Sequence, residues 1–381
     1  MTRGRPDATA GAAVALARAM LDALDCAPPV DSGAAFPRAW WKHLADRRLL
    51  GLGFDLDGRG ARAGWPEIAR LAGLVAEQTA SLGLALAWLL NEMVGRFVIG
   101  AHANTEGQRA MLRMMASGRL LVGMAISEPD AGSHPKRMAC AAVRDGDRWL
   151  LNGRKSHVSN GPAADAFVVL AVTGEIAGRR AFDAFVVDAG HAGLQVHPAA
   201  AAALAPLGQA ALLLNGCAVP DARRLDTQGD AYRRIVRPMR IVEDALLAGA
   251  IIGAMRCEMR AFAAWLQGTQ PAPATARRLG AFHLELVALE ALADQAAQHL
   301  ERHGPDDALA GLNVGTRLAF ARWQADFEGF AATFDDLGDR LHAAARDVRT
   351  VLGIARATGE RRQLDAGAAL LNSKESDEVA A

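Results

Sequence analysis

The chain has 381 residues, of which 51% are hydrophobic, and its 42 Lys and Arg balance its 42 Asp and Glu. That length is enough for two or three packed domains with a large core. A formal net charge of zero gives no basic field, which excludes bulk binding of nucleic acid or acidic lipid as the main activity.

The first third of the chain, residues 1–120, is predicted to be a helical domain. Apolar residues recur at helical spacing from Trp65 onward, and the run from Leu82 to Leu90 is apolar enough for a buried helix. Thr105 is a predicted N-cap before Gln108, and the helix that it opens should end near residues 117–118.

Beyond residue 120, short apolar runs alternate with turn residues, which predicts the strands of one compact β domain over residues 121–228. Asp145-Gly146 tolerates the positive φ angles of a tight hairpin, so the strands that flank it should pair antiparallel. The uncharged stretch from Pro198 to Pro220 is long enough to span a bilayer. Prolines and glycines interrupt it, however, and no transmembrane helix is predicted.

The helical period returns near Asp230, and residues 229–381 are predicted to form a third domain. Its expected breaks are short and lie at residues 267–273, 303–307 and 335–338. Short breaks between long helices indicate antiparallel neighbours, and hence a bundle of about four helices. The predicted fold class is therefore α+β: an N-terminal helical domain, a middle antiparallel β-barrel or sheet domain, and a C-terminal four-helix bundle.

The cysteines show no disulfide or metal pattern. No two of them form a C-x-x-C pair and no histidine stands at zinc-ligand spacing, so we expect no metal site and a reducing, cytoplasmic location. The arginines and the apolar run near the start resemble a signal peptide, but Asp7 and the high alanine content argue against one. The four cysteines are Cys26, Cys140, Cys217 and Cys257.

Two segments carry the most specific signal in the sequence. The first reads Met124-Ala-Ile-Ser-Glu-Pro-Asp-Ala-Gly-Ser133 and the second Asn152-Gly-Arg-Lys-Ser-His-Val-Ser-Asn-Gly161. Each alone is compatible with an ordinary turn or hairpin corner. Together, in this order and on predicted strands, they resemble the acyl-CoA dehydrogenase family, whose motifs read roughly T-E-P-x-A-G-S-D and G-x-K-x-W-I-T-N-G. The resemblance extends over nearly the whole chain.

The resemblance implies an FAD cofactor. An isoalloxazine ring is a flat plate with a polar edge, and it needs N–H and hydroxyl groups at that edge and small residues beside it. Ser127 and Ser159 keep a hydroxyl where the family usually has threonine, and His157 stands at the family's usual Trp position, where we expect contact rather than catalysis. The residues expected to bind the cofactor are Met124, Ala125, Ile126, Ser127, Gly132, Ser133, His157, Val158 and Ser159.

The implied reaction is desaturation of an acyl thioester, in which a carboxylate removes the α proton while the β hydrogen leaves as hydride to the flavin. The family's usual base, in a Y-E-G-T segment near the C-terminus, is absent here, because Arg356, or with a one-residue slip Ala355, stands at that position. Isovaleryl-CoA dehydrogenase and long-chain enzymes carry the glutamate on the first helix of the C-terminal domain, before a glycine. Glu243 stands at the matching distance before Gly253.

Glu243 itself and its neighbour Asp244 leave an alternative interpretation of Glu243 open. A glutamate in a first helical turn is often favoured by the helix dipole alone, which is the purely structural interpretation of Glu243. In addition, Asp244 occupies a position where the family usually has arginine.

The resemblance also implies an oligomer. The family completes each flavin site with the neighbouring subunit, through R-x-x-F-G and Q-x-x-G-G-x-G motifs that hold the adenosine diphosphate half. Here Leu266-Gln-Gly-Thr-Gln and Phe334-Asp-Asp-Leu-Gly-Asp stand near those places, and neither motif is intact. We therefore expect a homo- or hetero-oligomer, a dimer or tetramer, in which a partner subunit supplies the missing contacts.

Three functions are compatible with the sequence. The first is an FAD-dependent acyl-CoA dehydrogenase that acts on a thioester of CoA or of an acyl carrier protein, with Glu243 as base and an electron-transferring flavoprotein as acceptor. The second is a flavin-dependent monooxygenase on the same fold, which would not need the glutamate. The third is a catalytically silent subunit of a heteromeric member. The acyl chain cannot be read from the sequence, because several helices together set the pocket depth.

Overall fold

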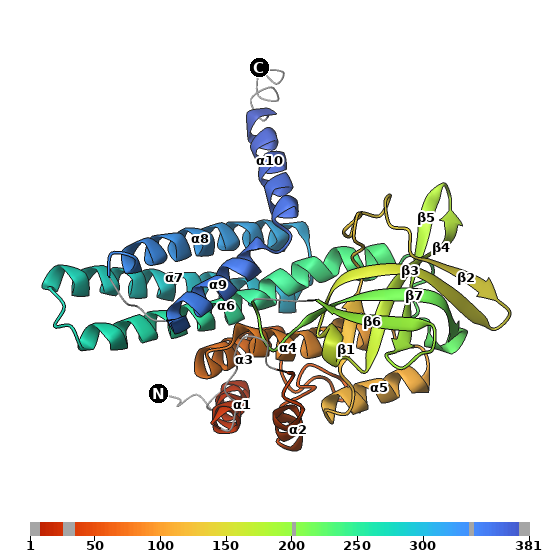
Figure 1. Cartoon of the computed structure of the whole chain (residues 1–381), viewed down its shortest axis with the longest axis horizontal. Coiled ribbons are helices and arrows are strands. Elements are labelled where there is room, and N and C mark those ends of the chain that lie inside the picture. The colour runs from red at the N-terminus through yellow and green to blue at the C-terminus, as the bar shows by residue number, and fades with distance from the viewer. Residues whose placement is uncertain (1–7, 26–34, 200–202, 335–338, 373–381) are drawn as a thin grey trace, which may run out of the picture.

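The computed structural model describes residues 8–25, 35–199, 203–334 and 339–372. Figure 1 shows a helical N-terminal part, a curled sheet at one end of the molecule, and long C-terminal helices that run away from the sheet. The predicted α+β fold class is thus confirmed. The domain limits at residues 120 and 228 stay a prediction.

The N-terminal part contains five α-helices and one π-helical segment among the described residues. The predicted cap at Thr105 is confirmed, since its hydroxyl accepts a hydrogen bond from the Gln108 amide at 3.2 Å. The elements are α1 (Ala8–Leu24), α2 (Arg38–Asp46), α3 (Trp65–Thr79), α4 (Leu82–Met93), the π-helical segment (Val94–Gly100) and α5 (Glu106–Ala116).

One stretch of this part has the length and composition of a membrane span. Within the described ranges, only Leu82–Gly100 qualifies, and 83% of its apolar window is buried inside the protein. Burial of that kind is typical of a core helix. Of the uncharged stretch from Pro198 to Pro220, the first two residues end strand β6 and residues 209–220 form strand β7, both described below.

In the described residues a short π-helical segment (Tyr232–Val236) and five α-helices follow the sheet, and four of these α-helices form the predicted bundle (Figure 1). The expected breaks at 267–273 and 303–307 are confirmed, whereas the break at 335–338 lies outside the described residues. The fifth helix, α10, projects away from the bundle and buries none of its residues. The helices are α6 (Arg237–Gln267), α7 (Pro273–His303), α8 (Asp307–Ala331), α9 (Asp339–Gly353) and α10 (Arg356–Asn372).

The sheet has seven strands in the order β1-β4-β2-β3-β7-β6, with β5 paired to β4. The predicted hairpin at Gly146 is confirmed, because β2 and β3 pair antiparallel with Asp145 opposite Arg148. The sheet is not wholly antiparallel, however, because the neighbouring strands β1 and β4 run parallel. In the sequence, the β2–β3 hairpin lies between these two strands and reverses the chain. The strands are β1 (Val122–Ala125), β2 (Ala141–Asp145), β3 (Arg148–Ser159), β4 (Ala166–Ile176), β5 (Arg179–Asp188), β6 (Leu194–Ala199) and β7 (Gln209–Pro220).

Helices α3 and α6 approach so closely that only glycine fits between them. A Cβ atom on Gly249 would lie 2.1 Å from the Ala69 carbonyl oxygen, and one on Gly253 would lie 2.0 Å from that of Gly73. The two helical parts therefore share one hydrophobic core. Their contact fixes the long helix α6, whose N-terminal end points at the sheet (Figure 1).

The bundle core also contains an ionisable group. Glu258 on α6 is 1% exposed, and the side-chain amide of Gln324 on α8 donates to both of its carboxylate oxygens, at 3.1 and 2.9 Å. Burial raises the pKa of the Glu258 carboxyl to about 7, and the nearby Glu328 carboxylate acts in the same direction.

Glu258→Gln is expected to stabilise the protein at pH 8 by about 2–3 kcal/mol, and by less at pH 5. The folded chain holds this proton more tightly than the unfolded chain, so the free energy of unfolding falls as pH rises from about 4.5 to about 7. Glutamine removes that penalty. Urea unfolding at both pH values measures the difference, and the exposed Glu360→Gln provides the control. An equal effect of Glu258→Gln at pH 5 and pH 8 would contradict the prediction.

Candidate functional site

A cleft of about 480 Å³ lies where the sheet meets the start of α6. Its walls come from β1, β3, the end of α4, the start of α6 and the turn between α9 and α10. The two sequence motifs and the start of the C-terminal bundle thus face one space. The lining residues are Leu90, Met93, Val94, Val122, Met124, Ile126, Ser127, Gly132, Ser133, His157, Ser159, Gln209, Val236, Met239, Arg240, Glu243, Ile354, Ala355 and Thr358.

A buried ion pair joins the two motifs. The ammonium group of Lys155 on β3, fully buried, donates to a carboxylate oxygen of Glu128 at 3.0 Å and to the Ile126 carbonyl at 2.9 Å. Glu128 also accepts the backbone N–H groups of Ala139 and Cys140, at 2.6 and 3.0 Å. All polar atoms of the pair have partners, so the contact fixes the first motif onto the strand that carries the second.

Seven of the nine residues predicted to bind a cofactor line the cleft. The exceptions are Ala125 and Val158, which are fully buried in the core on the other face of the sheet. Their neighbours Met124 and Ser159 face the cleft because successive residues of a strand point to opposite faces.

His157 lies two residues before Ser159 and lines the same cleft. It stands at an irregularity of β3: the pairing register between β3 and β7 shifts between Lys155 and Val158, and His157 has a φ angle of 55°. The ring nitrogen Nδ1 lies 3.1 Å from the Ser156 hydroxyl, and the side chain is exposed. This placement agrees with a contact role.

Several hydrogen-bonding groups of the cleft have no protein partner. In the described part of the chain, the hydroxyls of Ser127, Ser133 and Ser159 and the amide of Gln209 make no side-chain hydrogen bond. Gly132 has a φ angle of 54°, and no atom lies within 4 Å of the position that a Cβ would take. The cleft therefore offers polar groups beside open backbone.

Glu243 lies on the first turns of α6, with its side chain 23% exposed toward the cleft. Arg240 donates from Nη1 to Oε2 of Glu243 at 3.1 Å, and Nε of the same arginine donates to Asp244 at 3.0 Å. Among the described residues Oε1 of Glu243 has no hydrogen-bond donor. Burial raises the pKa of Glu243 above its ordinary value, while Arg240 lowers it, the Asp244 carboxylate raises it, and Arg317 lowers it.

The turn after α9 contains the two residues, 355 and 356, that the resemblance offers for the family's usual base position. Ala355 lines the cleft, whereas Arg356 turns away and pairs with Glu360 at 2.7 Å, with its side chain 80% exposed. Of these two residues, Ala355 is the one that lines the cleft. No acid or base from this turn reaches the cleft.

Sequence reasoning did not find most of the apolar walls or Arg240. The spacing of Arg240, three residues before Glu243, could have suggested the ion pair. The other walls come from segments far apart in the sequence, and no local pattern joins them. In the residues that the structure describes, no group of three or more His, Cys, Asp or Glu could hold a metal ion.

Residues 123–217 match the family model for the acyl-CoA dehydrogenase middle domain. An acyl-CoA dehydrogenase of Bacillus subtilis is 26% identical over 302 residues, covering 79% of this chain and 78% of that protein. The chain is therefore similar to acyl-CoA dehydrogenases, in its middle part and over most of its length. Mitochondrial isovaleryl-CoA dehydrogenase of Pongo abelii is 26% identical over 226 residues, or 58% of this chain and about half, 52%, of that protein.

The fold of the chain is also similar to that of solved acyl-CoA dehydrogenase structures. A glutaryl-CoA dehydrogenase from Mycobacterium smegmatis, solved in complex with FADH2, superposes with a TM-score of 0.73 over 92% of this chain and 91% of its own, at 17% identity. The helical segments and the sheet are thus arranged as in that dehydrogenase.

Lys155→Met is expected to lower the free energy of unfolding by about 3–5 kcal/mol, because it leaves the Glu128 carboxylate buried without its cation. Lys136→Met, at an exposed position of the segment between β1 and β2, is expected to change it by less than about 0.5 kcal/mol. Urea unfolding of both variants measures the contrast. Equal stabilities would show that the pair does not hold the motifs together.

Proposed function

We propose that this chain is an FAD-dependent oxidoreductase that introduces an α,β double bond into an acyl thioester. One observation supports the proposal above all: seven motif residues and the carboxylate of Glu243 line a single cleft. Of the two residues that the resemblance offers for the family's usual base position, only Ala355 lines the cleft, and Glu243 is the sole carboxylate among the described residues that line it.

The cleft fits a flavin. The unpartnered hydroxyls of Ser127 and Ser159 and the amide of Gln209 would serve its polar edge, and Gly132 leaves backbone open for close approach. Met124 and Ile126 offer apolar contact to a flat ring. When bound, FAD would supply the hydride acceptor for the β hydrogen of the substrate.

Glu243 would take the α proton on Oε1. That oxygen has no donor among the described residues, whereas Oε2 is held by Arg240, so the carboxylate is oriented and still has a free lone pair. Arg240 is itself held by Asp244 at the position where the family usually has arginine, so two neighbouring side chains fix the base. The apolar walls exclude water from the reacting carbons.

The pH dependence follows from the raised pKa of Glu243. The base works only when ionised, so the rate of α-proton removal is expected to rise with pH through that pKa and then to level off.

Glu243→Gln is expected to lower the rate of substrate-dependent flavin reduction by about a hundredfold to ten-thousandfold, because the amide cannot accept the proton. Flavin absorbance should be retained. Glu258→Gln, on the same helix but remote from the cleft, is the matched control and should keep its activity. Stopped-flow reduction of the reconstituted flavoprotein with a panel of acyl thioesters measures both.

The same variant separates the competing functions. Near-normal turnover of Glu243→Gln would reject proton abstraction by this residue and favour the monooxygenase. A chain that never binds flavin with any partner, or whose flavin is never bleached by a thioester, would be a silent subunit.

We also propose that a partner subunit completes the flavin site. With a rise of about 1.5 Å per residue, Leu266 lies about 35 Å along α6 from Glu243, so the far end of the bundle cannot serve the cleft of its own chain. At that end the ring centroids of Trp265 and Phe334 lie 5.7 Å apart, where the resemblance would place donors to a diphosphate. Residues 335–338 lie outside the described part.

The isolated chain is therefore expected to bind FAD weakly, because each missing charge-assisted hydrogen bond contributes about 1.5–3 kcal/mol. Co-expression with a paralogous subunit that carries the intact motifs should raise the flavin content per chain. Flavin absorbance combined with size-exclusion chromatography measures both quantities. Full occupancy of the isolated chain would overturn the need for a different partner.

The remaining assignments complete the proposal. Electrons would pass to an electron-transferring flavoprotein, and the substrate would be carried by CoA or an acyl carrier protein. The described cysteines Cys140, Cys217 and Cys257 are free, which supports a reducing, cytoplasmic location. Cys26 lies outside the described residues.

A further inference from the structure

We propose that Arg317 is a positioning residue that clamps the turn after α9 to the helix bearing Glu243, and so sets the width of the cleft at the base. This inference rests on the proposed role of Glu243. It concerns residues of three separate helices that the sequence motifs do not include.

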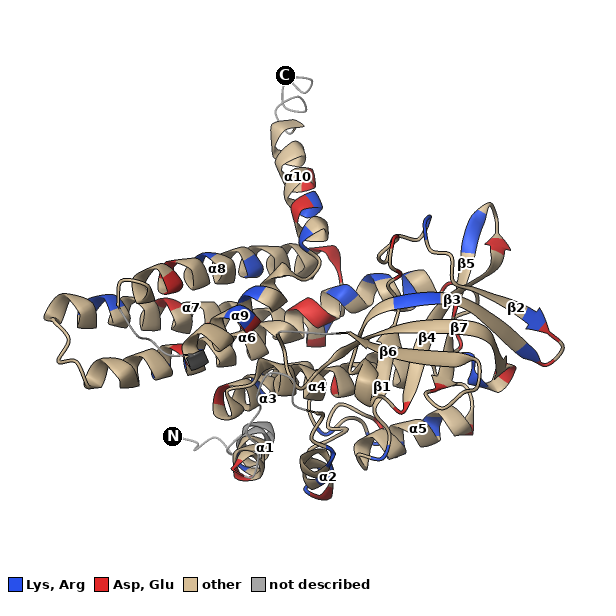
Figure 2. Cartoon of the chain, in the orientation of Figure 1, with Lys and Arg blue, Asp and Glu red and all other residues tan. Residues whose placement is uncertain are grey.

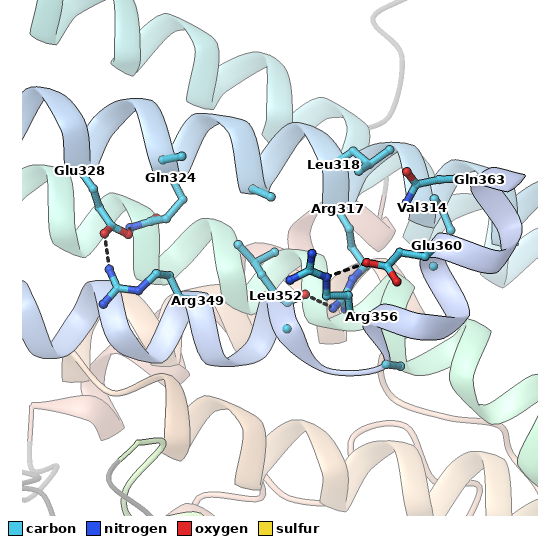
Figure 3. Close-up of a pocket in the computed structure, with 15 residues that line it drawn as sticks. Val314, Arg317, Leu318, Gln324, Glu328, Arg349, Leu352, Arg356, Glu360 and Gln363 are labelled. Atoms are coloured by element: carbon cyan, nitrogen blue, oxygen red, sulfur yellow. Dashed lines mark hydrogen bonds and ion pairs between the residues drawn. The ribbon is translucent and has the colours of Figure 1, made fainter. Parts of the chain in front are cut away.

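The Arg317 guanidinium joins three elements at once. From α8 it donates through Nη1 to Asp244 on α6 at 2.8 Å. Through Nη2 it donates to the carbonyls of Leu352 and Ile354, both at 2.8 Å, and of Val351 at 3.1 Å. Its side chain is only 16% exposed. Figure 3 shows Arg317 pointing from α8 toward Leu352 at the end of α9.

These carbonyls belong to the end of α9 and the residue that follows it. The last carbonyls of a helix lack intrahelical partners and carry partial negative charge, so a buried cation satisfies them well. Immediately beyond, Ala355 has a φ angle of 55°, a conformation that alanine adopts only when its surroundings impose it. Arg317 provides that constraint through the Ile354 carbonyl.

The clamped residues are those that face the base. Ile354 and Ala355 line the cleft together with Glu243. Asp244 is the common anchor, because it accepts from Arg317 and also from Arg240, which in turn holds Oε2 of Glu243. One network therefore fixes both the carboxylate and the opposite wall. A shift of about 1 Å between reacting groups can cost about a hundredfold in rate.

A second arginine, which lies at the contact between α8 and α9, provides a matched control. Arg349 on α9 pairs with Glu328 on α8 and crosses the same helix contact (Figure 3). Within the described part of the chain it makes no hydrogen bond or ion pair with Asp244 or with the turn, and neither residue of the pair lines the cleft. Loss of Arg349 should loosen the α8–α9 contact without moving the wall opposite Glu243.

The first test uses amide hydrogen exchange of the full chain, which requires neither flavin nor substrate. Arg317→Gln is expected to speed exchange of residues 353–358 by about tenfold or more, which corresponds to the loss of one charge-assisted hydrogen bond. Arg317→Lys should restore part of the protection, and it is the variant to use if glutamine prevents folding. Arg349→Gln should leave these amides unchanged.

The second test uses the reconstituted flavoprotein. Arg317→Gln and Asp244→Asn are each expected to lower kcat by about ten- to a hundredfold while KM changes far less, because the wall and base are displaced but the thioester site remains. The double variant should be no worse than either single one.

The outcomes separate this inference from the proposed function. Unchanged exchange in Arg317→Gln, or an equal change in Arg349→Gln, would overturn the clamp even if Glu243 is the base. Faster exchange with unaltered kcat would overturn its positioning role. Full activity of Glu243→Gln, by contrast, would remove the proposed function and leave the exchange result standing.

Discussion

The site depends on the buried contact between Lys155 and Glu128. Each motif alone is a short segment of turn or strand, and neither can form a binding surface by itself. The fully buried ammonium group binds both Glu128 and the Ile126 carbonyl, and the carboxylate takes two further backbone amides. An unpaired charge in this position would be costly, so the geometry of the two motifs is fixed by the need to keep the pair intact.

The second constraint is the placement of α6. Glycines at 249 and 253 let it lie directly against α3, where any side chain would strike backbone oxygen. A rigid helix anchored in the shared core presents Glu243 at its sheet-facing end, and Arg240 and Asp244 fix the carboxylate there. Helix α6 therefore serves both the candidate site and the core. A variant that moves α6 would affect stability and the site together.

The charged residues of the protein are distributed in two ways. Lys and Arg are scattered over the molecule rather than gathered in one field (Figure 2). Three ionic groups of low exposure instead occur at junctions: Lys155 between the motifs, Arg317 between α8, α9 and α6, and Glu258 between α6 and α8. At these places a cation or carboxylate joins segments that the apolar core alone would leave free to slide.

The order of helical and β segments, the hairpin at Gly146, the Thr105 cap and the two motifs could be predicted from the amino-acid sequence, because they depend on local periodicity and turn chemistry. The sequence also singled out Glu243. The three-dimensional fold was needed to show that Ala125 and Val158 face the core, that β1 and β4 run parallel, and that Ala355 rather than Arg356 lines the cleft. Strand pleating, a register shift and the α9 turn are set by contacts between distant segments, for which a single sequence contains no local signal.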